Sequence, residues 1–154
     1  MTYKLFYLIF LINGCASPAS NEITSEVSGI TRTDAQGRVL QQDPDDWRIQ
    51  RNFNGFISLD PLYPNPTSNG IVSIGIRYSL PSPIRLDILS TSTANTPVLV
   101  GSFNTPSFGT QFYTFNLQSL SATGNLAELK GKIFRLRFYD GSGALITYGD
   151  VQFE

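Results

Sequence analysis

The sequence of 154 residues contains no histidine, one cysteine and one tryptophan. Without histidine the chain has no Ser-His-Asp triad, no Cys-His pair and no imidazole metal ligand. One cysteine can form neither an intramolecular disulfide nor a thiolate zinc cage. Eleven basic and twelve acidic residues give a formal net charge of −1, so no basic excess points to a nucleic-acid partner. The composition therefore favours a non-catalytic protein without a cofactor.

A short apolar run near the amino terminus predicts a targeting segment. Residues 5–12 are apolar or aromatic and follow Lys4. Eight residues are too few to cross a bilayer, which needs about twenty. A basic start, an apolar run and a small residue before the cleavage point are typical of a secretory signal peptide. We assign residues 1–14 to this signal.

The single cysteine, Cys15, follows the apolar run after Asn13 and Gly14. This arrangement resembles the lipobox of bacterial lipoproteins, in which the signal is removed before the cysteine and the cysteine is then lipid-modified. Ile12 and Gly14 suit the positions at −3 and −1, whereas Asn13 differs from the small or aliphatic residue usual at −2. The resemblance implies a lipid anchor at Cys15, and several acyl chains on one residue hold a protein stably on a membrane.

The resemblance also implies a location in the cell envelope. The residue after the cysteine is Ala16 rather than the aspartate that keeps many lipoproteins in the inner membrane. We therefore expect a protein anchored in the outer membrane, on either its periplasmic or its surface face. Ordinary signal cleavage after Ala19, with loss of Cys15, is the alternative.

Residues 15–46 are expected to be the lipidated cysteine and a flexible linker. Residues 16–28 are mostly Ser, Asn, Thr, Ala and Glu, the composition of a spacer. Within residues 29–40 the segment from Asp34 to Gly37 is a turn signal, so a small hairpin is an alternative there. Asp43, Asp45 and Asp46 offer either oxygen ligands for calcium or ordinary turn and capping groups.

Residues 47–154 alternate between apolar and polar side chains with a period of two. In residues 70–80 the apolar set expected on one face is Val72, Ile74, Ile76, Tyr78 and Leu80. Further strands are expected at residues 53–59, 84–88, 98–103, 111–117, 133–139 and 145–153, with one helical turn at residues 126–129. This pattern predicts an all-β, antiparallel, immunoglobulin-like β-sandwich of about seven strands. Trp47 is expected to be buried at one end of the core of this sandwich.

The segment from Leu62 to Gly70 contains Tyr63-Pro64-Asn65-Pro66, and Tyr78-Ser-Leu-Pro81 follows after a β-alternating stretch. This pair of motifs resembles the opening of the carboxy-terminal sorting domains of type IX secretion. The resemblance covers residues 62–89 and implies an immunoglobulin-like sandwich. The two prolines have fixed φ angles and favour extended geometry at the residues before them, so the motif is expected to be a rigid segment that precedes the first strand.

These features favour a non-catalytic outer-membrane lipoprotein whose sandwich binds, or is built into, an assembly of envelope proteins. One alternative is a carbohydrate-binding module that uses aromatic side chains as platforms, and its candidates are Phe112, Tyr113, Tyr139 and Tyr148. Another is a protein secreted or sorted through type IX secretion. An enzyme is the least favoured class, because no spacing brings two carboxylates of Asp60, Asp87, Asp140 and Asp150 together.

Overall fold

The computed structural model describes residue 27 and residues 29–154, so the predicted signal peptide, Cys15 and most of the predicted linker lie outside the described residues. Within them lie nine strands: β1 (Arg32–Thr33), β2 (Val39–Gln41), β3 (Ile57–Leu59), β4 (Ile71–Tyr78), β5 (Arg85–Thr91), β6 (Pro97–Asn104), β7 (Gly109–Asn116), β8 (Ile133–Asp140) and β9 (Leu145–Gln152). Three short 3-10 helices connect them: η1 (Arg51–Phe53), η2 (Gln118–Leu120) and η3 (Leu126–Leu129). None of the helices in the described part of the chain has the length and hydropathy needed to cross a membrane.

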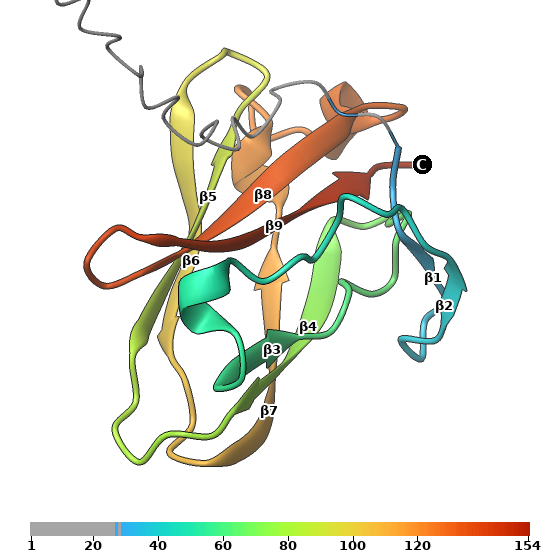
Figure 1. Cartoon of the computed structure of the whole chain (residues 1–154). Helices are drawn as coiled ribbons and strands as arrows, with labels where there is room; N and C mark the ends of the chain where they lie inside the picture. The colour runs from blue at the N-terminus through green and yellow to red at the C-terminus, as the bar shows by residue number, and fades with distance from the viewer. Residues whose placement is uncertain (1–26, 28) are drawn as a thin grey trace, which may run out of the picture.

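Seven of these strands form two sheets that pack face to face (Figure 1). The smaller sheet has the order β3-β4-β7 and the larger has the order β6-β5-β8-β9. Neighbouring strands within both sheets are antiparallel. The predicted all-β, antiparallel class is confirmed. Nine strands are found in the described residues rather than about seven, because β1 and β2 pair as a separate hairpin.

The core lies between the two sheets and follows the predicted alternation. Val72, Ile74, Ile76 and Tyr78 of β4 are buried, and the residues between them lie on the outer face of the smaller sheet. Leu80 was expected to continue this buried row but is 41% exposed. The reason is that β4 ends at Tyr78, which leaves Leu80 in the loop before β5. The predicted helical turn at residues 126–129 is confirmed as η3.

Residues 29–46 pack against the sandwich instead of standing apart from it. The hairpin of β1 and β2 turns at Asp34, whose carboxylate accepts hydrogen bonds from the backbone N–H groups of Gln36 and Arg38. Thr31 and Asp46 are 0% and 3% exposed. The packed part of the chain therefore begins before residue 47, the boundary that composition indicated. Asp46 accepts from the backbone N–H of Asp150 in β9, and the carbonyl of Thr31 accepts from the side chain of Asn65.

Trp47 packs against the core beside β9, as the sequence indicated. Its ring lies edge-on to Phe138 at a centroid distance of 5.8 Å, and its backbone N–H donates to the carbonyl of Tyr148 at 2.7 Å. The indole occupies the space above Gly149, where an added Cβ would lie 2.2 Å from Trp47 Cε2. Only glycine at residue 149 leaves room for this ring.

Replacing Gly149 by alanine is expected to lower the free energy of unfolding by about 1–3 kcal/mol, because the added methyl group displaces the indole. Gly101→Ala is the matched control, since its added Cβ meets nothing closer than Ile88 Cδ1 at 3.7 Å. Urea unfolding monitored by the fluorescence of Trp47 measures both variants. Equal stability of the two variants would contradict the close packing of Trp47 on β9.

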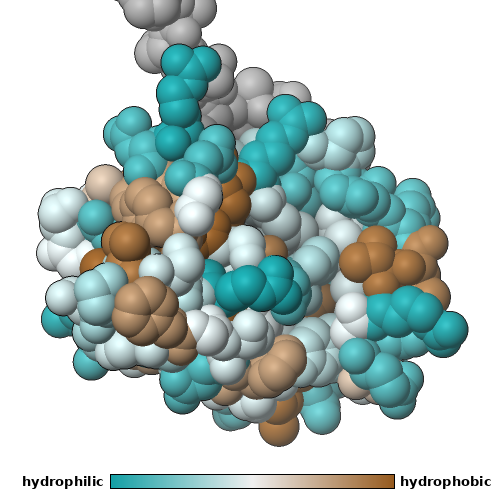
Figure 2. Space-filling model, turned by 60° about the horizontal axis from the view of Figure 1, so that its bottom comes forward, coloured by the Kyte–Doolittle hydropathy of each residue, from teal (hydrophilic) through white to brown (hydrophobic). Residues whose placement is uncertain are grey.

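The exposed large apolar side chains do not form one continuous surface. Figure 2, which brings the lower end of Figure 1 forward, shows hydrophobic surface in separate patches between hydrophilic side chains. Leu80 and Phe108 lie on neighbouring loops at that end, where the N–H of Phe108 donates to the carbonyl of Leu80 at 3.3 Å. Val39 and Leu40, on β2, are exposed elsewhere. Scattered apolar residues of this kind are ordinary on protein surfaces.

Candidate functional site

The motif Tyr63-Pro64-Asn65-Pro66 lies against the free edge of β9 rather than in solvent. Both of its X-Pro peptide bonds are cis. Tyr63 forms an antiparallel bridge with Ser73 of β4, and its ring lies within 3.4 Å of the position that a Cβ on Gly37 would take. The motif thus joins the β1–β2 hairpin to the sandwich, which gives it a structural role.

Asn65 is fully buried and bonds to backbone groups on two segments. Its side-chain nitrogen donates to the carbonyls of Thr31 and Asp150, both at 2.8 Å. Its side-chain oxygen accepts from the N–H of Gln152 at 3.0 Å. Asp46 adds to this contact by accepting from the N–H groups of Asp150 and Thr31. An unpaired strand edge invites pairing with other chains, and here side chains occupy the edge of β9.

A buried ion pair lies next to this edge, on the outer face of the larger sheet. Arg135 donates two hydrogen bonds to the carboxylate of Asp150, at 2.8 and 2.7 Å, and the two side chains are 4% and 1% exposed. A second carboxylate, Asp45, lies 3.5 Å from the guanidinium, and the ring of Tyr148 lies 4.3 Å from its central carbon. The hydrogen bond from Arg135 to Asp150 raises the pKa of Arg135, so its guanidinium stays charged although it is buried.

Each of the three carboxylates considered for calcium has protein partners, and the side chains of Asp43 and Asp45 also interact with each other. Asp43 accepts from the N–H of Asp45, Asp45 faces Arg135, and Asp46 accepts two backbone N–H groups. Among the described residues no group of three or more acidic side chains is arranged to hold a metal ion. These aspartates act as turn, pairing and capping groups.

Burial raises the pKa of Asp46 to about 6, although hydrogen bonds from Thr31 and Asp150 favour its charged form. A carboxyl group whose pKa is higher in the folded state stabilises the fold at low pH, and this stabilisation is lost as the pH rises through the folded pKa.

Between pH 4 and pH 7.5 the wild-type protein is therefore expected to lose up to about 3 kcal/mol of stability relative to Asp46→Asn, which does not titrate. Urea unfolding of both proteins across this range gives the difference curve, which is expected to fall between about pH 4 and pH 6 and to be flat above about pH 7. A flat difference curve would show that Asp46 keeps an ordinary pKa in the folded protein.

The four aromatic residues considered as sugar platforms do not form one surface. Phe112 is 62% exposed on the outer face of the smaller sheet, where it lies beside Gly75. Tyr113 stacks on Phe103 at 4.0 Å near the core. Tyr139 lies on the outer side of the larger sheet. Tyr148 lies on the same sheet, but its ring packs against the guanidinium of Arg135. Tyr139 lines one of the two surface hollows described below, and Tyr148 lines neither of them.

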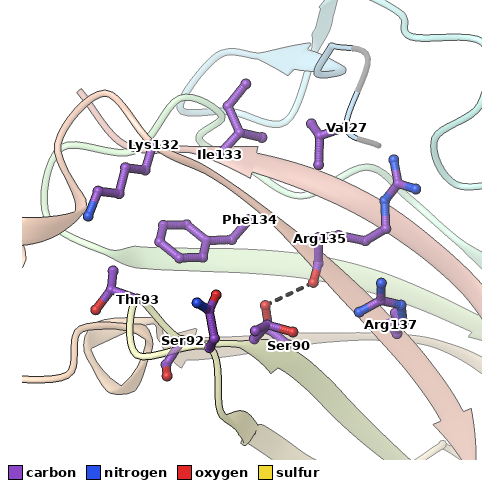
Figure 3. A pocket seen from close by; sticks show the side chains of 11 residues that line it. Val27, Ser90, Ser92, Thr93, Lys132, Ile133, Phe134, Arg135 and Arg137 are labelled. Atoms are coloured by element: carbon purple, nitrogen blue, oxygen red, sulfur yellow. Dashed lines mark hydrogen bonds between the residues drawn. The ribbon is translucent and has the colours of Figure 1, made fainter. Parts of the chain in front are cut away.

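The hollow of greatest interest lies where β5 and β8 separate. Their ladder ends at the pair Leu89 and Arg137, whereas β5 continues to Thr91 and β8 begins at Ile133. Ser90 bridges the gap by donating from Oγ to the carbonyl of Arg135 at 2.8 Å (Figure 3). The resulting hollow has a volume of about 480 Å³. It is lined by hydroxyl and amide groups, by the cations Lys132, Arg135 and Arg137, and by the apolar side chains of Val27, Ile133 and Phe134.

Lys132 and Arg137 lie at opposite ends of this hollow, and the ring of Phe134 lies between them (Figure 3). The guanidinium of Arg135 is directed away from Ser90, toward Asp150. The hollow is at the end of the sandwich where the described chain begins, because Val27 lines it as well. We define this set of residues as the Arg137 hollow.

A second hollow of about 520 Å³ adjoins the first and shares Ser90, Thr91 and Arg137 with it. Tyr139, Asp87 and Asp140 also line it. Hydrogen bonds from Ser102 and Arg85 lower the pKa of Asp87. Although burial acts in the opposite direction, hydrogen bonds from Ser142 and Ala144 lower the pKa of Asp140. Both carboxyl groups are thus held ionised, whereas a general acid for glycoside hydrolysis needs a raised pKa.

Sequence reasoning placed Asp87 on the outer face of its strand and Asp140 in a turn, and both placements are confirmed. It did not single out Lys132 or Arg137. Arg137 occupies an ordinary outward position in an alternating strand, and nothing in that alternation shows where β5 and β8 part. No local signal in the sequence distinguished either residue.

No model of a known protein family matches the chain, and no curated protein matches it.

Proposed function

We propose that this protein is a non-catalytic lipoprotein of the outer membrane whose β-sandwich binds another component of the cell envelope. The observation that carries the binding role is the pair of adjoining hollows of mixed polar and apolar lining on the larger sheet, the first of which lies where the described chain begins. Binding sites are concave and place a few polar groups toward their ligand. The anchor rests on Cys15, which follows the apolar run of the predicted signal.

The immunoglobulin-like type of sandwich belongs to the same proposal. In the constant-type arrangement one sheet holds the first, second, fifth and fourth strands, and the other holds the third, sixth and seventh. With β3 as the first strand, β3-β4-β7 and β5-β8-β9 reproduce these groups. The fourth strand, β6, pairs with β5 instead of β7, which moves it to the larger sheet. This grouping of strands supports the immunoglobulin-like part of the proposal.

Binding of carbohydrate is the second candidate, and the adjoining hollows are the specific observation in its favour. Tyr139 offers an aromatic ring beside hydroxyl groups and Arg137. Aromatic faces and adjacent polar groups are what sugar rings require. Phe112 and Tyr113 belong to other surfaces of the molecule and are not part of this candidate.

Crosslinking in intact cells followed by purification from membranes tests the proposed function. The wild-type protein is expected in the outer-membrane fraction with a crosslinked envelope component. Arg137→Glu is expected to lose that component, whereas Arg77→Glu, on the smaller sheet, is expected to retain it. Recovery in a soluble fraction, or crosslinking that is unchanged by Arg137→Glu, would contradict the proposal.

A further inference from the structure

The charged groups of the larger sheet are not all engaged in ion pairs. Arg85 pairs with Asp87, and Arg135 pairs with Asp150. Within the described residues, Lys132 and Arg137 have no acidic side chain within ion-pair distance. Both belong to the Arg137 hollow, so this hollow holds two positive charges available to a ligand.

One carboxylate, that of Glu128, is hydrogen-bonded to a residue that lines the Arg137 hollow. Glu128 accepts hydrogen bonds from the hydroxyls of Ser121, Thr93 and Thr123. These bonds lower the pKa of Glu128 to about 2. Although Thr93 lines the Arg137 hollow, Glu128 itself does not, and no acidic residue is among the described residues that line it. A negatively charged ligand therefore meets no carboxylate on the walls of the hollow.

The other lining groups are suited to sugar hydroxyls. Thr91 provides an exposed hydroxyl and Asn95 an exposed amide, whereas Ser90 and Ser92 are buried in the wall. Sugar hydroxyls both donate and accept, so they can bond to the Thr91 hydroxyl and to both the oxygen and the nitrogen of the Asn95 amide. The centre of a protein–protein interface is usually apolar and aromatic. The apolar side chains of this hollow are Val27, Ile133 and Phe134, and the ring of Phe134 is only 8% exposed. The described lining therefore offers no exposed aromatic centre, which favours a glycan over a protein.

We propose that the Arg137 hollow binds an acidic polysaccharide. Carboxylate groups of the glycan are held by Lys132 and Arg137, and its hydroxyls bond to the hydroxyl of Thr91 and the amide of Asn95, which are exposed in the same hollow. This inference rests on the proposed role as a binding module and names its ligand. The formal net charge of −1 makes non-specific attraction of a polyanion weak, so binding depends on these two local cations.

Titration of the full-length protein in detergent tests the assignment, with polygalacturonate as the acidic probe and dextran as the neutral one. The wild-type protein is expected to bind polygalacturonate, more weakly at high salt, and not dextran. Lys132→Gln and Arg137→Gln are each expected to lower the affinity about tenfold, the loss of one charge-assisted contact. Lys130→Gln and Arg77→Gln are the matched controls outside the hollow and are expected to bind as the wild type does.

Several outcomes overturn the assignment: no binding of polygalacturonate, equal binding of dextran, or equal losses in the hollow and control variants. A protein partner held through Lys132 and Arg137 in place of a glycan also overturns it. Thermal unfolding of each variant establishes that it folds, and Lys132 is exposed, so its substitution leaves packing intact. If the protein is lipidated at Cys15 but does not bind polygalacturonate, the acidic ligand is rejected and the lipid anchor is not. If the protein binds polygalacturonate but carries no lipid, the anchor is rejected and the ligand is not.

Discussion

Replacing Asp150 by alanine is expected to lower the free energy of unfolding by about 3–5 kcal/mol. The substitution leaves the guanidinium of Arg135 buried after removing the carboxylate that accepts two of its hydrogen bonds. Breaking one side of a buried ion pair has an effect of this size, because the remaining charge is desolvated without compensation. Asp45 remains at 3.5 Å, but its side chain is 30% exposed and does not take over both bonds.

The matched control for this prediction is Asp87→Ala, which removes the acidic partner of Arg85. The side chains of this pair are 58% and 23% exposed, and its loss is expected to cost less than about 1 kcal/mol. Urea unfolding of both variants measures the contrast. Replacing both members of the buried pair by apolar residues, as in Arg135→Met with Asp150→Leu, is expected to recover most of the stability. Losses of equal size for Asp150→Ala and Asp87→Ala would contradict the burial of the pair.

Asn65→Ala is expected to destabilise the protein by a similar amount, about 3–5 kcal/mol. The substitution leaves two buried carbonyls and the N–H of Gln152 without partners. Each unsatisfied buried polar group costs about 1–3 kcal/mol. Because Asn65 is 0% exposed, no water reaches these groups unless the structure opens. Hydrogen exchange is therefore expected to rise first at Gln152.

Asn69→Ala is the control for this second prediction. Its side chain accepts a hydrogen bond from the N–H of Ile71 in an exposed turn, and water replaces that bond when the amide is removed. A loss of about 1 kcal/mol or less is expected. If Asn65→Ala were as mild as Asn69→Ala, the motif around Asn65 would not be holding the edge of β9.

Local patterns in the sequence predicted those parts of the fold that depend on neighbouring residues. Alternation identified the buried row of β4 from Val72 to Tyr78, and the turn at Asp140 followed from its local sequence. The contacts at the edge of β9 could not be predicted in this way. Asn65 bonds to Asp150 across 85 residues and Asp46 bonds to it across 104. No periodicity connects positions so far apart.

The candidate site was missed for a related reason. The Arg137 hollow exists because β5 and β8 stop pairing at Leu89 and Arg137 while both strands continue. The end of a ladder depends on how two distant strands diverge, and the side chains of either strand alternate in the same way on both sides of that point. The aromatic residues that drew attention in the sequence, Phe112 and Tyr113, belong to the other sheet.

The Arg137 hollow is close in the sequence to the proposed lipid anchor. The Arg137 hollow lies at the end of the sandwich where the described chain begins, and twelve residue steps separate Val27, which lines it, from Cys15. A chain of that length spans at most about 40 Å when extended. A lipid on Cys15 would therefore hold the hollow within reach of the membrane surface, where the glycans of the envelope are found.

Metabolic labelling with a fatty-acid analogue tests the central claim most directly. The account predicts that the full-length protein takes up the label and stays with the outer membrane, and that Cys15→Ala abolishes both. An unlabelled protein released into a soluble fraction, with its mature amino terminus at residue 20, would contradict the account and establish ordinary signal cleavage after Ala19.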